Sequence, residues 1–200
     1  MLKTRLVAFA LLLMMAGVSA VAATAATVAE PERPTPAARI AAQREAMAPL
    51  ARMDGVWRGP AWILLPSGEK HVSTQTERIG PFLDGSVKVI EGRSYDAEGK
   101  VTFNAFGTIS YNPATHAYTL HSHALGNVGD FVLKPTADGY VWEIPAGLAT
   151  IRYTAVIKDG AWREVGDQIV PGKEPVHIFE MNLKRVGDTD WPAGGAVPPK

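Results

Sequence analysis

The sequence predicts an all-β fold, a single antiparallel up-and-down β-barrel of about ten strands preceded by a short helix. Between Gly55 and Val186, short runs typical of strands alternate with turns rich in Gly, Pro, Asn and Asp. No stretch with a helical period separates these runs, which excludes parallel sheets with crossover helices. An open meander has two unpaired edges that closure removes, so a barrel is favoured over the competing β-sandwich.

Residues 1–25 have the composition of a secretory signal peptide. Lys3 and Arg5 precede an apolar run over residues 6–18, and small residues suited to signal peptidase follow it. The run is shorter than the ~20 apolar residues that a spanning helix needs, which disfavours the alternative of an uncleaved anchor. We therefore expect cleavage at one of several sites between residues 20 and 26, a periplasmic or secreted protein, and no membrane span after cleavage.

The composition excludes several kinds of partner and of stabilisation. The chain has no Cys, so no disulfide holds the fold and no lipid can be attached to a cysteine. Its 20 Lys and Arg residues balance 20 Asp and Glu residues, without a basic cluster. This balance argues against nucleic acid as a partner. The length after the signal suits one domain of ordinary size.

A linker and a short helix come before the strands. Residues 26–36 include three prolines close together and predict an extended, flexible linker. The segment 37–53 opens with helix formers, and Thr35 with Pro36 has the residue types preferred at a helix N-cap and first turn. We predict one short helix there that ends before Pro49. The alternative is a flexible leader that does not dock.

The barrel domain is predicted over residues 54–186. Within it, Asp159-Gly160 is a dipeptide preferred in two-residue hairpin turns. Residues 187–200 are rich in Gly and Pro and are predicted to be a disordered tail. The predicted strands are residues 56–65, 70–79, 86–95, 101–111, 117–125, 130–134, 140–144, 149–158, 161–170 and 176–186.

Alternation of side chains along a strand assigns the interior of the barrel. In the last predicted strand, Phe179, Met181 and Leu183 form an apolar face. Counting by twos places His177 on the same face. The candidate residues of a ligand cavity are Tyr153, Glu164, His177, Phe179 and Met181.

The second predicted strand has no apolar face. One side of it presents His71, Ser73, Gln75 and Glu77. The other side is also polar, and the ninth predicted strand is similarly mixed. Strands that are polar on both sides suit a barrel whose interior holds water or a ligand. The alternative is that these are edge-like strands with a solvated surface.

The start of the first predicted strand resembles a known signature. Asp54-Gly55-Val56-Trp57 places a Gly-x-Trp directly after the helical segment, and this resembles the lipocalins and the wider calycin superfamily. The resemblance covers Gly55 to Val186. It implies a closed barrel end at which Gly55 and Trp57 lie. It also implies that a basic residue of the last strand, Arg185 here, packs over the Trp57 ring.

Two further features refine the resemblance. The runs Trp57–Trp62 and Phe82–Gly85 resemble a bacterial group of exported calycin-like proteins of unknown function. About ten strands also fit fatty-acid-binding-protein-like and nitrobindin-like barrels. The latter bind haem through a histidine, for which His177 is the one nominee. Their His and Glu motif is replaced here by Phe103–Gly107. We therefore expect no cofactor, with haem on His177 as the alternative.

One histidine pair is a candidate for metal binding. His121 and His123 are two residues apart and share a strand face. No third ligand is evident, and the opposite face, which includes Tyr118 and Leu120, is more apolar. We therefore expect both histidines to point to solvent and predict no metal site.

Five ionisable residues are candidates for acid–base chemistry in a polar cavity: His71, Glu77, Glu164, Asp167 and His177. The sequence has no Gly-x-Ser-x-Gly elbow, no Cys and no phosphate-binding loop that would order them into a mechanism. No catalytic residue is assigned on this basis.

These features together predict an exported calycin-like barrel that binds a small apolar or amphipathic molecule. The first alternative is an enzyme that uses the cavity for acid–base chemistry. The second is a structural or interaction protein that docks a partner through an exposed face or the helical leader.

Overall fold

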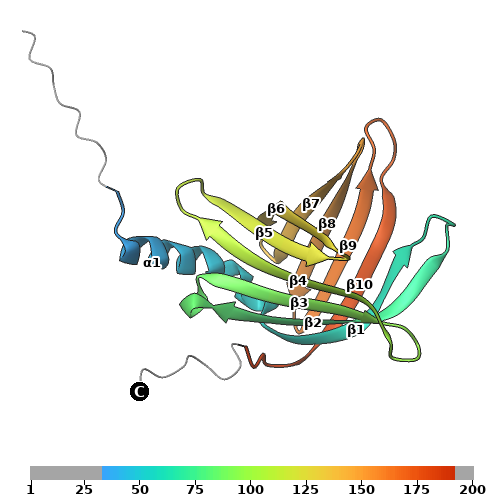
Figure 1. The fold of residues 1–200 in the computed structure, drawn as a ribbon, viewed down its shortest axis with the longest axis horizontal. Coiled ribbons are helices and arrows are strands. Elements are labelled where there is room, and N and C mark those ends of the chain that lie inside the picture. Colours follow the sequence, from blue (N-terminus) through green and yellow to red (C-terminus); the bar gives the residue numbers. More distant parts are fainter. Residues whose placement is uncertain (1–32, 192–200) are drawn as a thin grey trace, which may run out of the picture. The chain divides into compact units, whose positions relative to one another are not determined.

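The computed structural model describes residues 33–191. The predicted signal peptide, most of the linker and the end of the tail lie outside the described residues. Ten antiparallel strands form a closed barrel in sequence order, with β1 paired to β10 (Figure 1). The predicted up-and-down barrel is confirmed, and the competing sandwich is wrong. The strands are β1 (Gly55–Leu64), β2 (Lys70–Phe82), β3 (Val87–Tyr95), β4 (Val101–Asn112), β5 (Ala117–Ala124), β6 (Asn127–Pro135), β7 (Gly139–Ala146), β8 (Ala149–Lys158), β9 (Ala161–Ile169) and β10 (Val176–Gly187).

Most strands begin and end close to their predicted bounds, and β6 differs most. It begins at Asn127 rather than at Asp130, because the turn before it is tighter than predicted. Leu125 and Gly126 both have positive φ, at 51° and 77°. A two-residue turn with this backbone matches the twist of a hairpin, so Ala124 pairs directly with Asn127.

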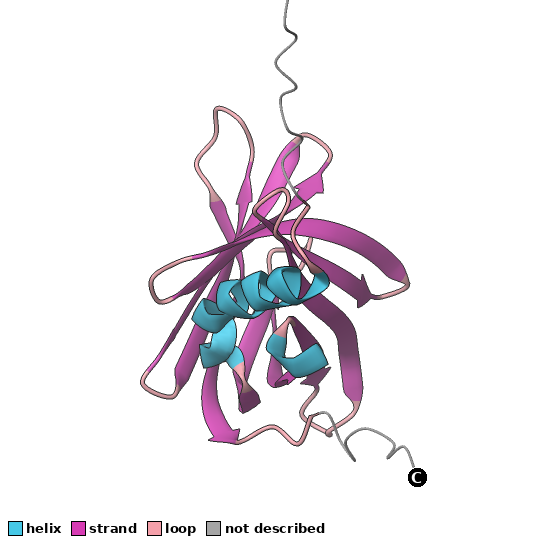
Figure 2. Ribbon diagram, turned by 90° about the vertical axis from the view of Figure 1, so that its left-hand side faces the viewer, coloured by secondary structure: helices cyan, strands magenta, loops and turns pink. Residues whose placement is uncertain are grey.

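Two helical segments lie across one end of the barrel. They are α1 (Pro36–Met47) and the 3-10 helix η1 (Ala48–Met53), which face the viewer in Figure 2. The Thr35 side chain accepts a hydrogen bond from the Ala38 N–H at 3.2 Å, as expected of an N-cap. Pro49 has no N–H to continue the α-helical ladder, and the chain tightens into η1 at this point.

Side-chain hydrogen bonds hold α1 on the barrel wall. The Gln43 amide donates to the Tyr111 carbonyl at 3.2 Å. The Tyr118 hydroxyl donates to the Ala46 carbonyl at 2.7 Å. The predicted helix therefore docks, and it covers the closed end of the barrel. None of the helices in the described part of the chain has the length and hydropathy needed to cross a membrane.

The hydrophobic core includes side chains of η1 and of the strands at this end of the barrel. Leu50 and Met53 of η1 are buried there together with Trp57 of β1. The Trp57 indole N–H donates to the Met53 carbonyl at 2.8 Å. Its ring meets Trp162 edge to face, with centroids 5.6 Å apart. A barrel of ten strands is wider than its own side chains can fill, so η1 supplies the packing that closes this end.

The opposite end of the barrel is the mouth, where the hairpins β1–β2, β3–β4, β5–β6, β7–β8 and β9–β10 turn (Figure 1). Each of these hairpins has an exposed apolar residue at or near its turn. We call this set the apolar rim, and it consists of Leu65, Val101, Leu125, Leu148 and Val176.

The chain after β10 packs on the outside of β2. The Trp191 ring meets Phe82 edge to face with centroids 6.0 Å apart. The Arg78 guanidinium lies 4.3 Å from the centroid of the Trp191 ring. The first residues of the predicted tail thus have packing partners, and residues 192–200 lie outside the described residues.

Replacing Leu50 by Ala tests the role of η1 in closing the barrel. Leu50 is 1% exposed, so we expect the free energy of unfolding to fall by about 2–5 kcal/mol, through lost burial and the cavity that remains. The matched control is Leu148→Ala at the mouth, where the side chain is 91% exposed. We expect that change to stay within about 0.5 kcal/mol. Urea unfolding measures both, and equal effects would show that η1 does not close the barrel.

Candidate functional site

A cavity of about 610 Å³ occupies the half of the barrel toward the mouth. It is lined from Leu125 of the apolar rim down to Met53 and Trp162 of the closed end. Most lining side chains are apolar or aromatic, and a few polar groups converge at the inner end. This composition is typical of sites that bind small molecules.

One wall of the cavity is aromatic. The rings of Trp142 and Tyr153 stack with centroids 4.4 Å apart and planes 12° apart. Phe131 lies 5.5 Å from Trp142, and Phe179 lies 5.7 Å from Tyr153, between ring centroids. Strands β6, β7, β8 and β10 supply these four rings. They form a continuous surface that can bury an apolar or flat molecule.

Four of the five predicted cavity residues line the cavity. Tyr153 and Phe179 belong to the aromatic wall. Met181 and Glu164 are buried lining residues further in, paired across β10 and β9. The fifth residue, His177, does not line the cavity.

The prediction that His177 points into the barrel is wrong, because β10 contains a β-bulge. From His177 to Phe179 the chain advances two residues, while its partner β9 advances one, from Asp167 to Gly166. The extra residue reverses the alternation of side chains. His177 therefore lies on the outer face, where its imidazole contacts Asp167 at 3.0 Å and Glu180 at 3.1 Å. A haem group in the cavity does not fit with His177 as its ligand.

The polar face of β2 lies inside the barrel. All four side chains predicted on that face line the cavity. His71 is in the strand part nearest the mouth, and Glu77 is paired in register with Trp57 of the closed end. For this strand the cavity interpretation is correct, and the solvated, edge-like interpretation is wrong.

Glu77 is buried at the inner end of the cavity and is 9% exposed. The Gln75 amide donates to Glu77 Oε1 at 2.6 Å. The Gln75 carbonyl oxygen in turn accepts a hydrogen bond from the Ser94 hydroxyl. Gly92 of β3 leaves room for the carboxyl group, since a Cβ at that position would lie 2.8 Å from Glu77 Oε1. Strands β2 and β3 thus build a pocket for this one side chain.

Glu164 of β9 is the second buried carboxyl group and is 6% exposed. The Tyr140 hydroxyl donates to Glu164 Oε2 at 2.6 Å. The Trp142 indole N–H donates to Glu164 Oε1 at 3.1 Å. Both donors come from β7, so each carboxyl oxygen has a fixed partner and the side chain is held in one orientation.

Trp162 contributes a third donor that is not used. Within residues 33–191, its Nε1 is the one buried side-chain nitrogen or oxygen without a hydrogen bond. The side chain is 2% exposed and lines the cavity. Trp162 lowers the pKa values of both Glu164 and Tyr140, although its N–H does not reach hydrogen-bond geometry with either group. A buried donor left unpaired costs about 1–3 kcal/mol, and such groups occur at functional sites.

Burial raises the pKa of both carboxyl groups. The pKa of Glu77 is raised to about 8, and burial is the largest cause. The Gln75 hydrogen bond lowers this pKa, whereas the charges of Glu164 and Glu91 raise it further. For Glu164, burial also raises the pKa, against the effect of its surrounding Tyr and Trp donors. Since each charge disfavours the other, the two groups act as an interacting pair at the inner end of the cavity.

Gly55, Trp57 and Arg185 lie together at the closed end, where Arg185 is the register partner of Trp57. The Arg185 guanidinium donates to the Asp54 carbonyl at 3.4 Å and to Asp188 at 2.6 Å. A Cβ on Gly55 would lie 3.0 Å from Arg185 Nε, so glycine allows this approach. Among the described residues, the cation–π contacts are Lys70 with Trp62 and Arg78 with Trp191. The structure thus does not show the cation–π packing of Arg185 on Trp57 that the resemblance implies, and oxygen acceptors position Arg185.

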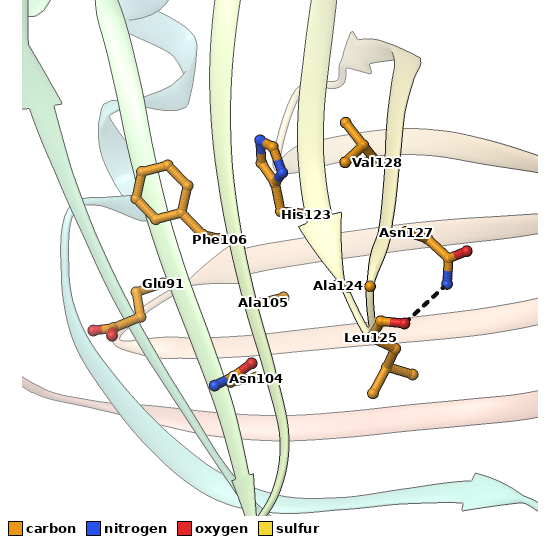
Figure 3. Close-up of a pocket in the computed structure, with 10 residues that line it drawn as sticks. Glu91, Asn104, Ala105, Phe106, His123, Ala124, Leu125, Asn127 and Val128 are labelled. Atoms are coloured by element: carbon orange, nitrogen blue, oxygen red, sulfur yellow. Dashed lines mark hydrogen bonds between the residues drawn. The ribbon is translucent and has the colours of Figure 1, made fainter.

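His121 and His123 point away from the cavity. His121 Nδ1 lies 2.6 Å from Asp130 Oδ1. His123 lies beside Phe106 in a shallow groove of about 340 Å³ on strands β3 to β6 (Figure 3). In residues 33–191, no group of three or more His, Cys, Asp or Glu side chains is arranged to hold a metal ion.

Sequence reasoning placed Gln75 beside Glu77 on one strand face but missed other hydrogen-bonding residues around the two carboxyl groups. Tyr140 was not selected as a site residue, and neither was Ser94. A signal for Tyr140 was present, because Tyr140, Trp142 and Ile144 alternate along β7 and all line the cavity. The strand predicted over residues 140–144 contains all three residues, so the alternation was visible in the sequence.

Comparison with known proteins identifies a fold and no family. No protein family model matches the sequence, and no curated protein is detectably similar to it. The crystal structure of Rv2717c from M. tuberculosis is similar with a TM-score of 0.53 and 12% identity, over 70% of this chain and 96% of that chain. The S-type phycobiliprotein lyase CPES from Guillardia theta has a TM-score of 0.48 and 12% identity, over 69% of this chain and 90% of that chain. The barrel implied by the calycin resemblance is what the structure shows.

The raised pKa of Glu77 predicts a pH dependence of stability. The ordinary pKa of Glu is 4.5, whereas folded Glu77 titrates at about 8. Its contribution is therefore fully present below pH 4.5 and is lost as the pH rises toward 8, because only the unfolded chain releases the proton in this window. We expect Glu77→Gln to remove this slope and to stabilise the protein at pH 8 by about 2–4 kcal/mol relative to the wild type.

Urea unfolding across pH 4.5 to 8 measures the effect of Glu77→Gln. The control is Glu143→Gln, because Glu143 is exposed on β7 and pairs with Arg152 across the outer surface at 2.7 Å. This variant should keep the slope of the wild type. An unchanged slope in Glu77→Gln would mean that the Glu77 carboxyl group is ionised in the folded protein.

Proposed function

We propose that this protein is an exported calycin-like barrel that binds a small apolar or amphipathic molecule in its cavity. The observation that carries the proposal is the hollow half of the barrel, a cavity of about 610 Å³ between the apolar rim and the core. Its aromatic wall would bury the apolar part of a ligand. The polar groups at its inner end would fix the orientation of the ligand and provide specificity.

Export is the second part of the proposal. The charged, apolar and small-residue order of residues 1–25 supports cleavage of a signal peptide. The resemblance of Trp57–Trp62 and Phe82–Gly85 to exported calycin-like proteins supports the same location. The protein would then meet its ligand in the periplasm or outside the cell, with no nucleic acid and no cofactor involved.

A cavity-filling substitution tests the binding site. Ala105 of β4 lines the cavity, so Ala105→Phe should place a ring in the space for the ligand. We expect the affinity for a neutral apolar fluorophore such as N-phenyl-1-naphthylamine to fall at least about 10-fold, because the apolar area available for burial is lost. A fluorescence titration measures the affinity.

The control for this test is Val132→Phe, which adds a ring at an exposed position on the outside of β6. It should leave the affinity unchanged. If neither the wild type nor the control binds the fluorophore or any alkyl ligand, the proposed function is wrong. Equal binding by Ala105→Phe and Val132→Phe would place the probe outside the cavity.

Cleavage is tested by expressing the full chain in a Gram-negative host and measuring the mass of the product in the periplasm. We expect a chain that begins at residue 21, 24 or 26, because the preceding small residues fit signal peptidase. A chain that retains residues 1–25 and stays in the cytoplasm would contradict export.

The pair of buried carboxyl groups favours one second candidate, acid–base catalysis inside the barrel. Glu77 and Glu164 line the same cavity, and a carboxyl group with a pKa of about 8 can hold and release a proton near neutral pH. The five residues predicted for acid–base chemistry do not all meet in the cavity, because His177 and Asp167 pair with each other on the outer face. Binding is the function that the cavity as a whole supports best.

A further inference from the structure

The inner end of the cavity contains two buried acidic groups, and His71 toward the mouth is the one lining residue of the described chain that can carry positive charge. Glu77 and Glu164 line it, and no Lys or Arg is among the lining residues of the described chain. Lys88 is buried nearby at the closed end, but its ammonium group lies 2.5 Å from Asp54 Oδ1 and does not line the cavity. No positive side chain at the inner end would repel a cation there, and ionisation of Glu77 or Glu164 would balance its charge.

The donors around Glu164 match an ionised carboxylate. An ionised carboxylate accepts about four hydrogen bonds and donates none, whereas a protonated one must place its own O–H. Tyr140 and Trp142 already donate to Glu164, and the Trp162 N–H remains an unused donor at the same end of the cavity. The cluster is thus built for a carboxylate but lacks the cation that would balance it. Among the described residues, Glu77 accepts one side-chain hydrogen bond, from Gln75 on Oε1, so its Oε2 is left for a donor in the cavity.

We propose that the cavity selects amphiphiles whose polar end is a protonated amine, which Glu77 and Glu164 receive at the inner end of the barrel. This inference rests on the proposed function of small-molecule binding and names the chemical class of the ligand. The apolar part of the ligand lies along the aromatic wall formed by Phe131, Trp142, Tyr153 and Phe179. Rings near an ammonium group add cation–π attraction.

Binding of the ammonium group changes the protonation of the carboxyl pair. Gln75 donates to Glu77, and the charges of Glu164 and Glu91 raise the Glu77 pKa. Glu91 is itself paired with Arg78 and Arg93. The Tyr140 hydroxyl donates to Glu164. The pKa values of Tyr140 and Tyr153 are raised further above neutral pH, so both hydroxyl groups stay protonated. A cation therefore favours ionisation of Glu77 or Glu164, and the displaced proton is released to solvent. A fatty acid would instead add a third acidic group to the same place.

Calorimetric titration of the mature protein with three ligands of equal chain length tests the proposal. The ligands are decylamine, decanol and decanoate at pH 7, each below its critical micelle concentration. We expect decylamine to bind at least ~10-fold more tightly than decanol, and decanoate to bind most weakly. Titrations in two buffers with different ionisation enthalpies should show release of up to about one proton with decylamine and none with decanol.

Variants test whether the preference for decylamine over decanol depends on the two carboxyl groups. The double variant Glu77→Gln with Glu164→Gln keeps the shape of both side chains, and it should bind decylamine and decanol within about 3-fold of each other. Glu143→Gln on the outer surface should keep the preference of the wild type. Proton release by the wild type gives a second measurement should the double variant fail to fold.

The outcomes separate this inference from the proposed function. If decanol or decanoate binds as tightly as decylamine, or decylamine binds without proton release, the amine class is wrong and small-molecule binding stands. If none of the three ligands binds, both proposals are wrong.

Discussion

The structure depends on a constraint of barrel closure: ten strands enclose more space than their inward side chains can fill. Packing is therefore concentrated at one end, where Trp57 and Trp162 meet edge to face and η1 places Leu50 and Met53 beneath them. This end supplies the stability of a fold that has no disulfide. Because the core is gathered there, the other half stays hollow, and it becomes the cavity of about 610 Å³.

The hollow interior leaves polar groups buried inside the barrel, which lowers the stability of the folded state. Two buried carboxyl groups without a basic partner destabilise the folded state as the pH rises, which a purely structural barrel would have no reason to keep. Gly92 makes room for one of them, and β7 supplies two donors to the other. Natural proteins place such locally unfavourable features at functional sites. The proposed amine ligand supplies the missing positive charge and uses the aromatic wall for its apolar part.

The sequence predicted the barrel, the order of its strands and the helix before them, because turn residues and strand periodicity are local signals. It also predicted that the polar face of β2 is unusual, which led to Glu77. It failed at His177, since the β-bulge between His177 and Phe179 leaves no mark in the hydrophobic pattern and reverses the assignment of the residue beyond it. It missed Tyr140, whose role depends on Glu164, two strands away in the sheet. Pairings of this kind follow from the register of a closed barrel, which no single strand encodes.

Native mass spectrometry of the protein, purified from its native host without denaturation, tests the central claim most directly. The account predicts a bound small molecule whose mass disappears on denaturation and is absent from Ala105→Phe. It further predicts that this molecule contains an amine. A protein that shows the mass of the bare chain, both as purified and after incubation with an excess of alkyl ligands, would contradict the claim that the hollow half of the barrel is a binding site.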